Sequence, residues 1–349
     1  MQFLRFTGAE MLIEIARFWA SVTTWNQEQE RYEILGVLGP DEYHEAYPDS
    51  DQPGLNNNTY TNVMAVWVLQ RALEVLEVLP PHYRQELVDE LTIRDNELDR
   101  WLEITRKMKV VFHSDGVLTQ FEGYEQLLEF DWEGYREKYG NIQRLDRVLE
   151  AEGDSPNRYK LAKQADVLML LFLLSRDELR ELLGTLGYEV TADQLARTVT
   201  YHLAHTSHGS TLSGVVSAWV LARYKPEEAW QFLLRALESD IADVQGGTTA
   251  EGIHLGAMAG TVDIVLRCLT GMQAHGEVLR FEPSLPPEVK ELKFSVHYRG
   301  HRIDVALAED HMEVSSRPGS APPIQVVVHN ETVELSPGAQ HEFPLEHRP

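Results

Sequence analysis

The spacing of hydrophobic residues predicts a chain that is helical over most of its length. Between residues 9 and 270, apolar side chains recur every three or four positions in most segments, which is the period of an amphipathic helix. Two stretches lack this period: a Gly-, Pro- and Asp-rich loop over 36–58, and an aromatic, charged segment over 111–158 that we expect to form only short helices. The expected helices are 9–25, 61–79, 82–108, 160–174, 176–186, 192–202, 213–223, 227–236 and 253–270.

After residue 278 the hydrophobic period changes from 3.6 residues to 2, as in β-strands with one buried face. Strands are expected over 293–298, 302–307, 312–314, 324–328 and 332–335. Prolines at 283, 286 and 287 mark the boundary. The sequence therefore predicts a mainly α fold with a C-terminal β domain: a helical region over 1–277, then a small antiparallel β-sandwich over 278–349.

The charge of the chain limits its partners. The formal net charge is −24 over 349 residues. Nucleic acids and anionic membranes attract basic surfaces, so neither is an expected partner. A chain of this length can bury a large core and form more than one domain.

The N-terminus and the cysteine content point to the cytoplasm. The chain opens without the charged leader, apolar run and cleavage site of a signal peptide, and its longest apolar run, 167–174, is too short to span a membrane. Cys268 is the only cysteine, which excludes an intramolecular disulfide and a cysteine-based zinc site. We therefore expect a cytoplasmic protein.

The loop over 36–62 gathers carboxylate, imidazole and amide side chains. It contains Gly-Pro-Asp-Glu-Tyr-His-Glu over 39–45 and three consecutive asparagines over 56–58. Hydroxyl-rich ligands such as sugars need many planar donors and acceptors, which these side chains supply. Partial burial beside Tyr43 would raise the pKa of Glu42 and make it a proton donor near neutral pH. The alternative is a solvated acidic turn.

Three more polar segments lie at or near the starts of predicted helices. Residues 205–213 are rich in His, Ser and Thr, and hydroxyls with backbone N–H groups at a helix N-terminus can bind an anion such as phosphate. The alternative there is helix capping by Ser210 or Thr211. The segment over 245–254 is rich in Gly and Thr, and 163–166 reads Lys-Gln-Ala-Asp. Motifs of dinucleotide sites, P-loops, zinc proteases and serine hydrolases are absent from the sequence, so no metal site is predicted.

Taken together, these motifs resemble glycoside hydrolase family 65, the inverting α-glucoside phosphorylases that act on maltose, trehalose, kojibiose and related disaccharides. The resemblance extends over essentially the whole chain, and five ordered motifs make it specific. The matching stretches are 36–45, 57–62, 163–167, 208–213 and 247–254.

The resemblance implies a role for each motif. Glu42 corresponds to the general acid, and Lys163 with Gln164 contacts the glucosyl unit. The phosphate site corresponds to His208, Ser210, Thr211 and Ser213. We also expect Asn57, Asn58 and Glu251 to bind the sugar. Inorganic phosphate would be a co-substrate, and no cofactor is expected.

Three functions stay open at this point. The first is phosphorolysis to β-glucose 1-phosphate and a free sugar, which needs one acid, whereas an inverting hydrolase needs a second carboxylate to activate water. The second is a hydrolase that releases glucose with water. Family members have a β-sandwich before the (α/α)6 barrel, so the resemblance implies that this chain starts within the barrel. The third possibility is therefore a half that is inactive without an N-terminal partner chain, or that forms a homo-oligomer.

Overall fold

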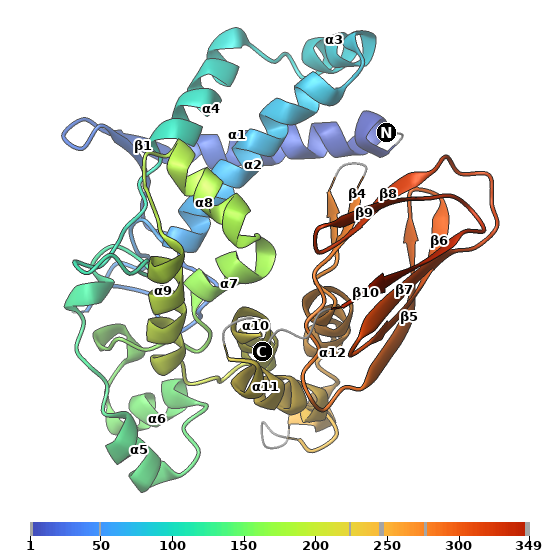
Figure 1. Ribbon diagram of the computed structural model, residues 1–349. Coiled ribbons are helices and arrows are strands. Elements are labelled where there is room, and N and C mark those ends of the chain that lie inside the picture. The colour runs from blue at the N-terminus through green and yellow to red at the C-terminus, as the bar shows by residue number, and fades with distance from the viewer. Residues whose placement is uncertain (1–2, 49, 223–224, 244–247, 276–277, 346–349) are drawn as a thin grey trace. The chain divides into compact units, whose positions relative to one another are not determined.

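The computed structural model describes residues 3–48, 50–222, 225–243, 248–275 and 278–345. The chain forms two compact units, Met1–Ser213 and Gly214–Pro349. Figure 1 shows the elements of each unit in order along the chain. The predicted order, helices first and strands last, is confirmed.

The first unit consists of helices joined by long loops, with one short hairpin. Its elements are η1 (Leu4–Gly8), α1 (Ala9–Ser21), β1 (Thr23–Asn26), β2 (Arg31–Ile34), α2 (Thr59–Val78), α3 (Pro81–Glu90), α4 (Asp95–Lys107), η2 (Tyr124–Gln126), α5 (Trp132–Tyr139), α6 (Leu145–Glu152), η3 (Pro156–Arg158), α7 (Asp166–Leu173), α8 (Arg176–Thr185), α9 (Ala192–Ala204) and the start of α10 (Thr211–Leu221).

The central helix of this unit is α2. Asn58 caps its N-terminus, because the side-chain oxygen accepts a hydrogen bond from Thr61 N. Half of the α2 residues are buried, and the helix packs against α1, α4, α7 and α8. A helix that is buried on several sides has apolar residues all around it and no clear apolar stripe. Because α2 is packed in this way, it fixes the position of the loop that ends at its N-terminus.

The structure differs from the predicted helices at three places. The hairpin β1–β2 was not predicted. The expected helix over 82–108 is two helices, because Thr92 adopts a left-handed φ of 52° and interrupts the helical backbone. The sequence has no Gly or Pro at this position to indicate the break. Helix α7 begins at Asp166 instead of 160, because the backbone before it pairs with other segments: Ala162 N donates to His205 O at 2.8 Å.

The second unit begins with helices and ends in two sheets. Its elements are the rest of α10, α11 (Pro226–Glu238), η4 (Thr248–Glu251), α12 (Leu255–Asp263), η5 (Ile264–Leu269), β3 (Gln273–His275), β4 (Val278–Phe281), β5 (Glu291–Tyr298), β6 (His301–Ala308), β7 (His311–Ser316), β8 (Ile324–Val328), β9 (Glu331–Leu335) and β10 (Gln340–Pro344).

The strands form two four-stranded sheets, with orders β10-β7-β6-β5 and β3-β4-β8-β9. Apolar side chains from both sheets share one core, including Phe281, Val314 and Phe343. The expectation of an antiparallel domain is corrected in one respect: β4 and β8 pair in parallel, because the chain crosses to the other sheet between them. Strands β3, β4 and β10 were not predicted.

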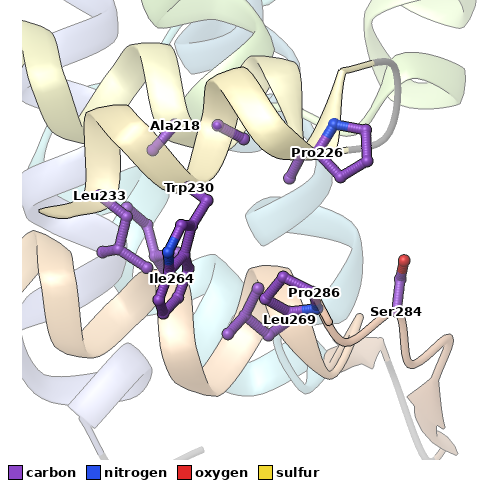
Figure 2. A pocket seen from close by; sticks show the side chains of 10 residues that line it. Ala218, Pro226, Trp230, Leu233, Ile264, Leu269, Ser284 and Pro286 are labelled. Carbon is purple, nitrogen blue, oxygen red and sulfur yellow. The ribbon is translucent and has the colours of Figure 1, made fainter. Parts of the chain in front are cut away.

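A small cavity in the second unit lies between α10, α11, η5 and the segment before β5 (Figure 2). Trp230 and Leu233 line it from α11, and Ile264 and Leu269 line it from η5. Its volume is about 30 Å³, room for about two water molecules and too small for a glucosyl ring.

Within the described residues, no helix is long and apolar enough to cross a membrane.

Candidate active site

The acidic loop is fixed by a buried carboxylate next to Glu42. Asp41 is buried, and its Oδ1 accepts a hydrogen bond from Lys163 N at 2.7 Å. Its Oδ2 lies 2.9 Å from His44 Nδ1, and the other ring nitrogen of His44 lies 3.0 Å from Tyr159 O. These contacts attach the loop to the segment before α7, so the backbone at Glu42 has a defined position.

Glu42 itself faces solvent. Its side chain is 61% exposed, and Oε2 accepts a hydrogen bond from Lys163 Nζ at 2.6 Å. The expectation that Glu42 is partly buried beside Tyr43 is therefore wrong in this structure. Glu42 has a left-handed φ of 66°, and the next residue, Tyr43, takes the buried position.

Tyr43 connects the acidic loop to two other segments. Its hydroxyl donates to Gln143 O at 2.9 Å and lies 3.1 Å from Ser207 Oγ. Burial raises the pKa of Tyr43 to about 12, so the hydroxyl stays neutral. Tyr43 is a positional anchor for the loop.

Lys163 and Gln164 lie directly against the acidic loop, as the sequence motifs suggested. The ion pair of Lys163 with Glu42 is one contact, and Gln164 Nε2 donates to Pro40 O at 2.9 Å as a second. A carboxyl group, an ammonium group and an amide therefore come together from segments about 120 residues apart.

The His-, Ser- and Thr-rich loop packs on the same place. A Cβ atom at Gly209 would lie 3.2 Å from Lys163 Cγ, 3.2 Å from Tyr43 Oη and 2.2 Å from Gln143 O, so only glycine allows this approach. Ser207 N also donates to Ala162 O at 2.8 Å. The two loops on which the sequence hypothesis depends are thus neighbours in one unit.

The predicted phosphate-binding residues surround the start of α10. His208 has a left-handed φ of 55°, and its Nδ1 lies 2.8 Å from Ser213 Oγ. Ser210 Oγ accepts a hydrogen bond from Leu212 N at 3.3 Å, which is the capping role considered as the alternative. Thr211 is the first residue of α10, and Ser213 is buried.

Asn57 and Asn58 are placed differently from the expected sugar contacts. Both are buried and bonded within the protein. Asn57 Nδ2 donates to Glu122 Oε2 at 2.7 Å, and Asn58 Nδ2 donates to Asp166 Oδ2 at 2.8 Å. In this structure their amides fix the loop before α2, and neither residue is exposed to a ligand in solvent.

Glu251 is the last residue of η4 in the second unit, and its side chain lies outside the described part of the structure. Nearby, His254 Nδ1 lies 2.6 Å from Asp240 Oδ1, a contact that fixes the end of this Gly- and Thr-rich segment. Among the described residues, no group of three or more His, Cys, Asp or Glu side chains is placed to hold a metal ion.

Sequence reasoning missed two charged residues near Glu42. Arg144 forms a bidentate pair with Asp146, with Nε–Oδ1 at 3.1 Å and Nη2–Oδ2 at 2.7 Å. The hydrogen bond with Asp146 raises the pKa of Arg144, and the charge of Glu42 adds to this. Burial opposes ionisation of Asp146, but Arg144 outweighs it and the pKa of Asp146 is lowered. Both lie in the weakly periodic 111–158 segment, where the pattern gave no signal.

Comparison with known proteins identifies two matching domains. Residues 1–263 match the central catalytic domain of glycosyl hydrolase family 65, and residues 272–335 match the C-terminal domain of that family. A solved structure of a putative kojibiose phosphorylase from the human microbiome has the same fold, with a TM-score of 0.81 and 21% identity over 100% of this chain and 47% of that chain.

Two relatives illustrate the range of similarity. An uncharacterized glycosyl hydrolase of Mycobacterium tuberculosis is 50% identical over 325 residues, which cover 93% of this chain and 24% of the relative. Trehalose 6-phosphate phosphorylase of Lactococcus lactis is 34% identical over 339 residues, 97% of this chain and 42% of that enzyme. The chain thus spans less than half the length of these relatives. Because the central-domain match covers most of its residues, the chain belongs to glycosyl hydrolase family 65.

Proposed function

We propose that this chain carries the acid and phosphate loops of an inverting phosphorylase for an α-linked glucose disaccharide. The supporting observation is the contact of the 205–213 loop with the Glu42–Lys163 pair: Gly209 lies against Lys163, which in turn binds Glu42 at 2.6 Å. Several relatives are named as phosphorylases of trehalose 6-phosphate, kojibiose and maltose.

In the proposed reaction, Glu42 donates its proton to the glycosidic oxygen as the bond from that oxygen to the anomeric carbon breaks. An oxygen of inorganic phosphate, held by His208, Ser210, Thr211 and Ser213, forms the new bond from the opposite face. The products are β-glucose 1-phosphate and a free sugar. Lys163 and Gln164 orient the glucosyl unit, Glu251 is also proposed to bind sugar, and no cofactor takes part.

We further propose that the helices form part of an (α/α)6 barrel that is completed by another polypeptide region. Met11, Ile15 and Phe18 of α1 and Val22 at its C-cap recur at three- and four-residue spacing, and all are exposed. Such an apolar stripe needs a partner helix in water. The matched relatives are more than twice as long as the aligned part, so they contain further regions.

Size-exclusion chromatography tests this partner. The chain mixed with the product of the adjacent upstream reading frame should elute as one larger species. Phe18→Asp should abolish the association, and Glu10→Gln, at an exposed polar position of α1, should leave it intact. A chain that stays monomeric under all these conditions contradicts the proposed barrel, and self-association assigns the stripe to a homo-oligomer.

The decisive assay measures glucose 1-phosphate from maltose, trehalose, trehalose 6-phosphate and kojibiose, with and without phosphate, for the chain alone and with that partner. Glu42→Gln should lower kcat by about 10²- to 10⁴-fold, the usual contribution of a general acid. Glu45→Gln, on the same loop and exposed, is the matched control. Glucose released equally fast without phosphate would indicate a hydrolase, and full activity in Glu42→Gln would reject the assignment. A cytoplasmic location stays a prediction from the sequence.

A further inference from the structure

A second carboxyl group lies beneath the acidic loop, outside the proposed machinery. Asp166, the first residue of α7, is 1% exposed. Its Oδ2 accepts a hydrogen bond from Asn58 Nδ2 at 2.8 Å, while its Oδ1 is buried without a hydrogen-bond partner among the described residues. A buried carboxyl group with so few partners is unusual and costs free energy when it is ionised.

The acidic loop begins directly on this hydrogen bond. A Cβ atom at Gly39 would lie 1.9 Å from Asp166 Oδ2 and 2.5 Å from Asn58 Nδ2, so the loop backbone touches both groups. Two residues later, the carboxylate of Asp41 accepts a hydrogen bond from the backbone N–H of Lys163. Glu42 follows Asp41 directly in the chain. Its position therefore depends on the contact of Gly39 with Asp166 and on the hydrogen bond between Asp41 and Lys163.

Electrostatics favour the neutral form of Asp166. Burial raises the pKa of Asp166 well above its usual range, and the neighbouring Asp41 raises it further. The hydrogen bond from Asn58 and the nearby backbone of Asp41 oppose this rise only in part. Asp41 accepts hydrogen bonds from two backbone N–H groups, those of Lys163 and Gln164, and Asp166 receives neither of them.

The other titratable groups around Asp166 do not compensate its charge. Burial raises the pKa of Tyr60 in α2, and the charge of Asp166 adds to it. Burial likewise raises the pKa of Tyr124 in η2. Both phenols are neutral near pH 7, and Lys163 directs its ammonium group to Glu42. Within the described residues Asp166 forms no ion pair.

We propose that Asp166 is a positioning residue for Glu42, and that it works as a neutral carboxylic acid whose ionisation loosens the loop over 39–45. The proposal rests on the proposed acid role of Glu42, but Asp166 can be tested without any turnover. Asp166→Asn keeps the oxygen that Asn58 needs and removes the titration. Asp177→Asn, at an exposed position of α8, is the matched control.

Infrared spectroscopy and thermal unfolding of the whole chain give the first test. At pH 7 the unchanged protein should show the carbonyl band of a protonated carboxylic acid, and Asp166→Asn should lose it. An aspartate in the unfolded chain loses its proton at a pH of about 3.9, whereas Asp166 in the folded chain keeps its proton there. The unchanged protein therefore loses stability as the pH rises above that value. The melting temperature of Asp166→Asn relative to the unchanged protein should therefore rise with pH, while that of Asp177→Asn should not. A missing band together with a pH-independent difference would overturn the proposal.

An exchange of partners tests the positioning role. Asn58→Asp alone puts a further carboxylate beside Asp166 and should lower the melting temperature sharply. Asn58→Asp combined with Asp166→Asn reverses the hydrogen bond, keeps a good N-cap for α2, and should recover most of the loss. A double variant no better than the single one would show that this bond does not hold the loop.

Activity gives the last arm in the assembled enzyme. The alkaline fall in kcat should move to higher pH in Asp166→Asn, with little change in KM, and an unchanged profile would contradict the positioning role. If no glucoside is turned over at all, the proposed function fails, while the infrared and unfolding results still decide the state of Asp166.

Discussion

The two units of the chain are stabilised by different kinds of core. The β-sandwich buries apolar side chains from both sheets, including Phe281, Met312 and Phe343. The first unit, called the helical unit below, contains in addition a connected set of buried or half-buried charged and amide groups. Burying a charge costs free energy unless its partners compensate it. The contrast indicates that the sandwich core serves stability, whereas the polar groups of the helical unit also determine where particular loops lie.

Lys109 shows how such a polar group works. Its Nζ lies 2.8 Å from Glu33 Oε1 and 2.7 Å from Glu122 Oε1. Glu122 Oε2 also accepts a hydrogen bond from Asn57 Nδ2. Burial opposes ionisation of Glu33, but hydrogen bonds from Lys109 and Asn26 outweigh it and the pKa of Glu33 is lowered. The group connects β2, the loop before α2 and the segment before η2.

The largest expected effect on stability comes from the sandwich. Phe281→Ala should lower the free energy of unfolding by about 3–5 kcal/mol, because it leaves a cavity in a fully buried core. Hydrogen exchange should show the loss in the strands, with protection of the helical unit unchanged. Arg302→Ala, an exposed position on β6, is the control. Equal loss of protection around Glu42 would contradict the division of roles.

A smaller loss of stability with a larger effect on the site is expected at Lys109. Lys109→Met leaves Glu33 and Glu122 together without their cation, which should cost about 3 kcal/mol. The loop before α2 should also lose protection, because Asn57 binds Glu122. Lys107→Met breaks an exposed pair with Glu103 and should cost under about 1 kcal/mol. The idea that buried charges fix the loops fails if the two variants behave alike in denaturant titrations.

His208→Ala tests the proposed phosphate loop without touching either core. Loss of one hydrogen bond to a charged group costs about 1.5–3 kcal/mol, so the KM for phosphate should rise at least about tenfold. His205→Asn, a neighbour outside the proposed phosphate contacts, is the control. Phosphate dependence that is the same in His208→Ala and in the unchanged enzyme would remove His208 from the site.

The smallest effect near neutral pH is expected from His202 in α9. Burial lowers the pKa of His202 to about 3, and its Nε2 donates to Leu118 O at 2.7 Å. In the unfolded chain the imidazole of His202 binds a proton below a pH of about 6.5, whereas in the folded chain it stays neutral. The first unit should therefore lose stability as the pH falls from there towards 3. His202→Gln should flatten this dependence in urea titrations at pH 7 and pH 5, and exposed His82→Gln should not. A slope unaffected by His202→Gln would assign the acid sensitivity elsewhere.

Much of the fold follows from local patterns. A period of 3.6 predicted most helices, and alternation predicted β5 to β9, because each element needs one buried face. The motifs around Glu42, Lys163 and His208 were recognisable because they combine chemically unusual side chains with glycine turns. That these segments belong together was a hypothesis from sequence, and their contact in one unit is an observation of the structure.

Other features depend on contacts between distant segments. Three features arise where loops meet: the exposure of Glu42, the burial of Asn57 and Asn58, and an Asp166 oxygen without a hydrogen-bond partner in the described part of the chain. The parallel pairing of β4 with β8 arises where the chain crosses between sheets. A local pattern records which side chains can be buried in an element. Only the tertiary structure decides which polar groups share a buried site, because their hydrogen bonds and mutual charges depend on distances between residues far apart in the chain.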